Sequence, residues 1–270
     1  MRDLGVRWTI GDVSAFGFEA LRLSIWGAYR AFGADTEMVV FVNSLPIEEA
    51  RKKTRDVPDI VSWACADRAP AFLDDFLDGE MAEGVAWKLA PLRAFPDRFE
   101  LSLDNDCIFW KIPPTVETWL WERPPRCLIA ADVKAAFGSF SSLAGSRPRN
   151  TGIRGLPPGY DLGQALQAVL QDHPMRLGSE LDEQGLQAVA LDRDRPAHVV
   201  SAEEVTICSP FWPHEPRLGS AGAHFVGLNS HRLPWDYYGR PASEWVSENW
   251  RRLRPELCRR VGVAEEAASP

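Results

Sequence analysis

Hydrophobic and polar positions along the first third of the chain predict a strand, a helix and a second strand. Arg7–Gly11 has the length and composition of a short strand, and Gly17–Gly33 carries apolar residues at helical spacing. Glu37–Asn43 is almost continuously apolar, as expected for a parallel strand that is covered on both faces. A strand–helix–strand unit of this size predicts an α/β sheet with right-handed crossover connections.

The rest of the chain continues this organisation. The pattern predicts strands over Asp59–Trp63, Phe99–Leu103, Arg126–Ala131 and Ala223–Leu228, and helices over Ile47–Lys53, Ala86–Ala94, Asp161–Gln171 and Leu181–Leu191. Gly138–Pro158 and Ser209–Ala221 lack such patterns and are expected to be loops, which at this length are usually functional or mobile. We expect one domain over residues 1–263 and a disordered polar tail over residues 264–270.

Composition narrows the class of protein. The 270 residues carry a net charge of −8, which disfavours a nucleic-acid binder because such proteins show basic surfaces. The five cysteines are scattered and never form a CxxC pair, which argues against a disulfide scaffold and a thiolate zinc site. No apolar run approaches the ~18–20 residues of a membrane span, and the N-terminus lacks the apolar core of a signal peptide. A soluble, cytoplasmic protein is therefore expected.

The most informative segment is the acidic pair Asp104 and Asp106, which follows the predicted strand Phe99–Leu103. Two carboxylates spaced by one residue lie on the same side of an extended chain, where they repel each other unless a cation offsets their charge. A solvated turn is the alternative, since Asp-Asn-Asp is good turn composition. The apolar residues on both sides favour a buried strand end, and open α/β sheets bind their ligands at the carboxyl ends of strands. We therefore expect a divalent cation with oxygen ligands here.

This arrangement, preceded by Trp87-Lys88-Leu89, resembles the DxD motif of GT-A type glycosyltransferases, most closely glycosyltransferase family 8. Further segments follow in the family's order. Asn150–Gly152 resembles its Asn-x-Gly turn, Asp182–Leu186 its acidic-Gln-x-Leu helix start, and His224–Gly227 its His-aromatic-x-Gly segment. The chain departs from the family after His224, because the expected Lys-Pro-Trp is replaced by Ser230–Trp235, where Arg232 or His231 takes the place of the lysine.

The resemblance implies a single GT-A-like α/β domain with a doubly wound, mixed and mostly parallel sheet flanked by helices. It implies a Mn²⁺ or Mg²⁺ ion held by Asp104, Asp106 and His224 under a nucleoside-diphosphate sugar, with a UDP-sugar as the expected donor. The residues expected on the donor side are Asp12, Lys88, Asp104, Gly227 and Arg232, and those expected to line the acceptor side and act in catalysis are Glu183, Gln184 and Asn150.

Each residue also has a structural interpretation. Lys88 could be a surface lysine, His224 a core histidine, and Glu183 and Gln184 ordinary residues of a first helical turn. Asn150 could serve only a turn, and Asp12 could cap the following segment instead of binding a base or ribose.

A metal-dependent glycosyltransferase is the leading functional expectation, with a glycan, lipid or small molecule as the acceptor. Two alternatives stay open: a haloacid-dehalogenase-like phosphohydrolase with an Asp-x-Asp motif, and a non-catalytic descendant that binds nucleotide or glycan.

Overall fold

A seven-stranded mixed sheet forms the centre of the protein in a computed structural model that describes residues 3–66, 68–78 and 87–265. Its strand order is β3-β2-β1-β4-β7-β6-β8. The strands are β1 (Leu4–Ile10), β2 (Glu37–Val42), β3 (Val61–Cys65), β4 (Phe99–Leu103), β6 (Leu128–Ala131), β7 (Arg149–Leu156) and β8 (His198–Val200). All neighbouring pairs are parallel except those that β7 makes with β4 and β6. The expected mixed, mostly parallel sheet is thus confirmed.

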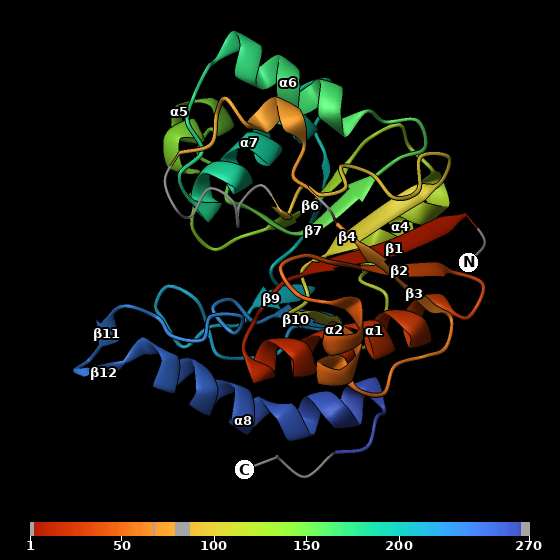
Figure 1. The fold of residues 1–270 in the computed structure, drawn as a ribbon, viewed down its shortest axis with the longest axis vertical. Helices are drawn as coiled ribbons and strands as arrows, with labels where there is room; N and C mark the ends of the chain where they lie inside the picture. The colour runs from red at the N-terminus through yellow and green to blue at the C-terminus, as the bar shows by residue number, and fades with distance from the viewer. Residues whose placement is uncertain (1–2, 67, 79–86, 266–270) are drawn as a thin grey trace.

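Helices cover both faces of this sheet (Figure 1). One side carries α1 (Ala15–Phe32), α2 (Ile47–Thr54) and α8 (Ala242–Val261), and the other carries α5 (Ser141–Ala144), α6 (Leu162–Asp172) and α7 (Glu180–Asp192). Helix α1 begins where the Ser14 hydroxyl accepts a hydrogen bond from the Gly17 amide at 3.1 Å, a standard N-cap. The first predicted strand–helix–strand unit is therefore present, with its bounds shifted by a few residues.

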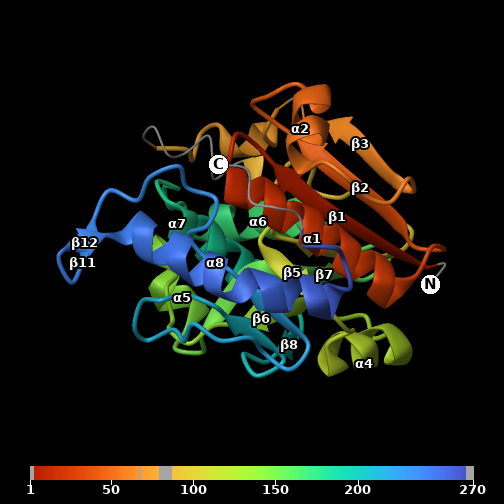
Figure 2. The same ribbon diagram turned by 90° about the horizontal axis from the view of Figure 1, so that it is seen from below.

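A second, three-stranded sheet packs against the outer side of α1. It consists of β5 (Cys107–Phe109), β10 (Gly222–His224) and β9 (Val205–Ile207), in the order β5-β10-β9. Apolar residues of this sheet, α1 and α8 form one hydrophobic cluster, and Figure 2 shows α8 lying along α1. Helix α1 is consequently buried between the two sheets, and β5 follows β4 through the Asp104–Asp106 turn.

Two predicted elements are wrong. Gly138–Pro158 is not a loop, because it contains the short helices η2 (Gly138–Phe140) and α5 and the eight-residue strand β7. The predicted helix over Ala86–Ala94 does not extend past Trp87, which is helical: residues 88–94 form turns, bends and irregular structure, and Ala86 lies outside the described residues.

The predicted strand over Ala223–Leu228 continues only to His224, after which the chain turns. The sequence patterns did not predict α4 (Pro114–Glu122), α8, or the short pair β11 (Asp236–Tyr237) and β12 (Arg240–Pro241). A last short helix, η1, covers Ala71–Leu73. The expected disordered tail lies outside the described residues from 266 onward.

No helix within the described parts of the chain has both the length and the apolar character needed to cross a bilayer.

Candidate metal and donor site

The Asp104–Cys107 segment is a tight turn at the carboxyl end of β4. The Asp104 carbonyl accepts a hydrogen bond from the Cys107 amide at 2.9 Å, and the Asp104 amide donates to the Gly152 carbonyl of β7 at 2.9 Å. Asn105 is anchored behind the turn, where its side-chain amide donates to the Gly17 carbonyl at 3.0 Å. Asp104–Asp106 therefore forms the turn that its composition favours, and this turn holds both carboxylates in fixed positions.

His224 reaches these carboxylates through strand pairing. β10 runs antiparallel to β5, with His224 opposite Cys107, and the Phe225 amide donates to the Asp106 carbonyl at 2.9 Å. The Nε2 atom of His224 lies 3.2 Å from Asp106 Oδ1 and 3.5 Å from Asp104 Oδ2. Three residues that are far apart in sequence therefore converge, as predicted.

The geometry of this triad suits a divalent cation. Potential ligand atoms of Asp104, Asp106 and His224 all lie within 4.8 Å of one another, which is about twice the metal–ligand distances of ~2.0–2.4 Å that Zn²⁺, Mg²⁺ and Ca²⁺ sites show. The side chains of Asp106 and His224 are only 3% and 4% exposed, and Asp106 Oδ1 is buried facing His224 Nε2 at 3.2 Å, without a hydrogen bond of good geometry among the described residues. A buried carboxylate oxygen in this state fits a ligand position.

Gly152 makes room for the histidine. A Cβ atom at this position would lie 2.3 Å from Cε1 and 2.5 Å from Nδ1 of His224. Asn150, two residues earlier on β7, accepts a hydrogen bond from the Gly152 amide at 2.8 Å and donates to Asp132 at 3.1 Å. The Asn-x-Gly segment thus lies on a strand instead of in a turn after one, and the missing side chain of Gly152 leaves room for the histidine.

The charges in the site balance each other. Burial lowers the pKa of His224, but the negative charges of Asp106 and Asp104 outweigh this and raise it to about 10. Burial raises the pKa of Asp104, yet Lys88 and His224 outweigh burial and hold it below its usual range. The two carboxylates therefore favour the protonated form of His224 in the metal-free protein, and a metal ion bound here would take the place of that proton.

Lys88 lies beside this triad. Its Nζ atom is 3.4 Å from Asp104 Oδ2, and the charge of Asp104 raises the pKa of the ammonium, to which Glu183 and Asp106 add. The segment after Lys88 rests on buried Arg7, whose guanidinium donates to the carbonyls of Pro91 and, at 3.2 Å, of Ala90. A fixed cation at the edge of a metal site is well placed for a phosphate.

Helix α7 carries Asp182, Glu183 and Gln184, and their side chains have different surroundings. Glu183 is 1% exposed; burial raises its pKa to about 7, against the lowering effect of Lys88. The Gln184 side chain turns to the Ala136 carbonyl, to which it donates at 2.9 Å. Asp182 is used by the helix start, where it accepts from the Ser139 amide at 2.7 Å and the Ser179 hydroxyl at 2.8 Å. Of these residues, only Glu183 is electrostatically coupled to Lys88 and Asp104.

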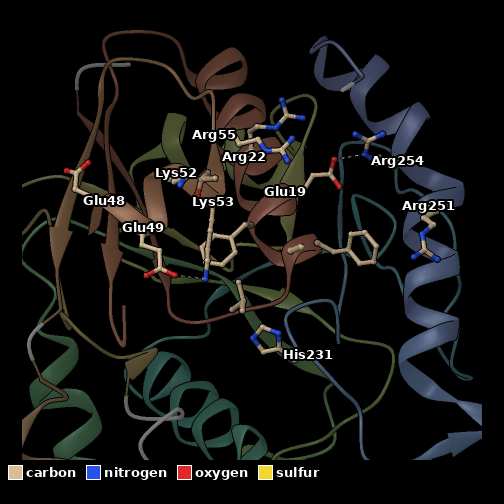
Figure 3. A pocket seen from close by; sticks show the side chains of 15 residues that line it. Glu19, Arg22, Glu48, Glu49, Lys52, Lys53, Arg55, His231, Arg251 and Arg254 are labelled. Carbon is tan, nitrogen blue, oxygen red and sulfur yellow. Dashed lines mark hydrogen bonds and ion pairs between the residues drawn. The ribbon is translucent and has the colours of Figure 1, made fainter. Parts of the chain in front are cut away.

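Asp12 follows β1 and makes two ion pairs, with Lys53 at 3.5 Å and with His231 at 3.7 Å. Both partners line a cavity of about 1300 Å³ between α1, α2 and α8, shown in Figure 3. Gly227 lies in a turn beyond His224 with a φ of 86°, which favours glycine. Arg232 is exposed, and no hydrogen bond or ion pair joins it to the triad within the described part of the chain. Asp12, Gly227 and Arg232 are thus not brought into the triad.

Sequence reasoning missed Asn229. Its side-chain amide donates to Asp106 Oδ2 at 3.2 Å and to Asn105 Oδ1 at 3.0 Å, so it orients the acidic turn. An asparagine in an irregular segment carries no pattern that would have revealed this role.

Comparisons with known proteins identify the fold. No protein-family model matches the chain, and no curated protein sequence matches it. Among solved structures, the galactosyltransferase LgtC in complex with donor and acceptor sugar analogs matches with a TM-score of 0.57 and 11% identity, over 98% of both chains. An active-site mutant of LgtC matches at 0.54 and 11%, over 92% of this chain and 95% of that one. Mouse xyloside xylosyltransferase 1 matches at 0.50 and 13%, over 78% and 89%. The protein therefore has the GT-A fold of these glycosyltransferases.

Proposed function

We propose that this protein is a metal-dependent glycosyltransferase that moves a sugar from a nucleoside-diphosphate sugar to an acceptor hydroxyl. The observation that carries the proposal is the convergence of Asp104, Asp106 and His224 beside Lys88, at the carboxyl edge of a GT-A sheet. LgtC, which shares the fold, was solved with donor and acceptor sugar analogs. We extend that class of ligands to this chain, with a UDP-sugar as the donor.

On the donor side, the triad would hold Mn²⁺ or Mg²⁺. Such an ion supplies positive charge that stabilises the departing diphosphate. Lys88 adds a second positive charge at 3.4 Å from Asp104, where it would contact the phosphates. Asn229 and Asn105 hold the acidic turn in place, so little reorganisation is needed when a ligand binds.

On the acceptor side, the bond between the anomeric carbon and the diphosphate oxygen breaks, and a bond from the acceptor oxygen forms. The diphosphate leaves with the bonding electrons, and its oxygen takes up the proton that the acceptor hydroxyl loses. The anomeric carbon becomes electron-poor during this exchange. An ionised Glu183, which lies near Lys88 and Asp104, would stabilise that developing positive charge.

The phosphohydrolase alternative fits the fold less well. In haloacid-dehalogenase-like enzymes the Asp-x-Asp motif normally lies on the first strand, whereas here it follows β4. A non-catalytic binding protein differs from the proposed enzyme only in turnover, and the experiment below separates the two.

The proposal is tested by calorimetry and by donor turnover. We expect UDP to bind in the presence of MnCl2 and much less with EDTA, and Asp106→Asn to abolish the manganese-dependent part. Asp172→Asn, which changes a surface carboxylate paired with Arg193, is the matched control and keeps wild-type binding. Donor turnover is measured as manganese-dependent release of UDP from UDP-sugars, to water or to added acceptors. UDP affinity that depends on neither manganese nor Asp106 contradicts the proposal, and binding without any turnover assigns a binding protein.

A further inference from the structure

A chain of three buried polar side chains connects strand β7 to helix α7. Arg154, Gln187 and Glu183 are 3%, 2% and 1% exposed. The Nη1 atom of Arg154 donates to Gln187 Oε1 at 2.5 Å, and the Nε2 atom of Gln187 donates to Glu183 Oε1. Gln187 lies four residues after Glu183, so both face the same side of α7. The chain therefore has a defined order, from the guanidinium through the amide to the carboxyl group.

Burying these three polar side chains in the core costs free energy of folding. They lie on the sheet face covered by α6 and α7, where the neighbouring buried residues, such as Ile129 and Leu186, are apolar. Glu183 Oε2 and the Nε and Nη2 atoms of Arg154 have no hydrogen-bond partner among the residues that the structure describes. Each such buried group costs ~1–3 kcal/mol. Stability alone favours apolar residues here, so a role in a ligand site explains the chain better.

The hydrogen-bonded side chains of Arg154, Gln187 and Glu183 are also fixed relative to the metal triad. Arg154 pairs with Ser102 of β4, two residues before Asp104. On the same strand, the Gly152 carbonyl accepts from the Asp104 amide, and the Gly152 backbone packs against His224. A single strand, β7, thus sets the position of the histidine through Gly152 and that of the Glu183 chain through Arg154.

The chemistry of the three groups dictates their orientation. An arginine can only donate hydrogen bonds, so it requires the carbonyl oxygen of Gln187 to face it. The Gln187 NH2 group must then face Glu183, and a donor in that position favours the ionised carboxylate. Oε1 is occupied in this way, and Oε2 is buried without a hydrogen-bond partner among the described residues.

We propose that Arg154 and Gln187 are positioning residues that hold Glu183 ionised and in a fixed orientation, with Oε1 bound by Gln187. The inference rests on the proposed function, because it assigns the carboxylate a role beside the anomeric carbon. The charged groups that act on Glu183 are Lys88, before β4, Asp104, at the end of β4, and Arg154, on β7. Lys88 and Arg154 favour the carboxylate, whereas burial and Asp104 favour the protonated form.

The test is an infrared titration of Glu183, which does not need turnover. The carboxyl band of protonated Glu183 is identified as the band lost in Glu183→Gln, and its midpoint is measured in the full chain without metal. Arg154→Met and Gln187→Leu should each raise the midpoint by about one pH unit or more, because each removes a group that stabilises the carboxylate. Arg154→Lys, which keeps a donor-only cation, should lie closer to the wild type. Arg193→Met, a surface arginine at the end of α7, should not move it.

Two further readouts separate positioning from general damage. Manganese-dependent UDP affinity should change less than twofold in Gln187→Leu, because the triad and Lys88 are untouched. In the same variant kcat should fall, the acid limb of its pH profile should move to higher pH, and the donor KM should change little. If Arg154→Met does not fold, Gln187→Leu decides alone. A midpoint that stays within 0.3 pH unit of the wild type in every folded variant of Arg154 and Gln187 overturns the proposal. Absence of transfer by the wild type overturns only the proposed function, because the titration still measures the positioning.

Discussion

At the scale of single residues, Gly152 controls how closely the ring of His224 can approach β7. A methyl group there would lie within 2.3–2.5 Å of two ring atoms, and no heavy atoms pack that closely. We therefore expect Gly152→Ala to displace His224 and to weaken manganese binding roughly 10- to 100-fold, as loss of a supporting contact around a metal ligand typically does. Titration of Mn²⁺ by calorimetry measures this.

Gly178→Ala is the matched control, because the nearest atom to its added methyl is the Asp78 carbonyl oxygen at 3.5 Å, an ordinary contact. Equal manganese affinity for Gly152→Ala and the wild type would show that the ring position does not depend on this glycine.

Glu183 gives a second prediction, on stability and pH. Burial raises its pKa to about 7 from an ordinary 4.5, so between these values the folded protein holds a proton that the unfolded chain has lost. The contribution of Glu183 to the free energy of unfolding therefore decreases as the pH rises from about 4.5 to 7. Glu183→Gln removes this dependence and should be more stable than the wild type at pH 8, by up to about 3 kcal/mol, and similar to it at pH 5.

Urea unfolding of both proteins at the two pH values provides the measurement, with exposed Glu48→Gln as a control that changes little at either pH. A Glu183→Gln protein no more stable than the wild type at pH 8 would contradict the raised pKa. If Glu183→Gln is more stable than the wild type at pH 8 but no longer transfers sugar, the carboxylate is retained for catalysis and not for stability.

At the scale of elements, helices and strands with a regular apolar pattern could be predicted from the sequence, and a strand rich in polar residues could not. Phe99–Leu103 is a strand with the predicted bounds, and the apolar spacing of α1 and α6 revealed both helices. β7 was mistaken for a loop because Arg149–Leu156 contains two arginines, an asparagine and two glycines. Buried polar residues of this strand bond to partners on other elements, such as Gln187 for Nη1 of Arg154 and Asp132 for Asn150. Those partners cannot be identified from a local pattern.

In the candidate site too, residues within a local motif could be predicted, and a residue that depends on a distant partner could not. Asp104, Asp106, His224 and Lys88 could be found because their resemblance to a known motif is carried by adjacent residues. Asn229 could not, because its contact with Asp106 bridges more than a hundred positions and depends on how the two sheets pack. The side chains of Asn150 and Gln184 were expected on the acceptor side, yet in the structure they hydrogen-bond protein groups.

The packing of α1 against β5 gives an element-level prediction. Gly27 lies where a Cβ atom would be 1.9 Å from the Phe109 carbonyl oxygen, a backbone atom that cannot move alone. Gly27→Ala should therefore separate α1 from the small sheet and lower the free energy of unfolding by at least about 2 kcal/mol, despite the higher helix propensity of alanine.

Gly163→Ala in α6 is the control, because its methyl would meet side-chain atoms and no backbone: a Leu92 methyl group at 3.0 Å, Asp161 Oδ1 at 3.3 Å and Gln167 Nε2 at 3.9 Å. Chemical denaturation of both variants supplies the comparison. If Gly27→Ala is as stable as Gly163→Ala, the close helix–sheet contact is not required by the fold.

At the scale of the whole molecule, the metal triad joins the two sheets. Asp104 ends a strand of the large sheet, His224 lies on the small sheet, and Asp106 is in the turn between them. The chain matches LgtC over 98% of both lengths at only 11% identity, so the arrangement of layers persists while most side chains differ. A ligand held by the triad contacts both layers at once and must therefore act on global stability.

The last prediction follows from this link. An ion that binds the folded protein but not the unfolded chain stabilises it by ~2.7 kcal/mol at a hundredfold excess over its Kd, which for a chain of this size corresponds to a Tm increase of about 5–10 °C. We expect MnCl2 to raise the Tm of the wild type by this amount and EDTA to reverse it. Asp106→Asn should show little increase, because one of the three ligands has lost its charge, whereas surface Asp172→Asn should behave as the wild type. An equal increase in Asp106→Asn would place the manganese elsewhere, on the exposed carboxylates of an acidic protein, and would separate metal binding from the junction of the two sheets.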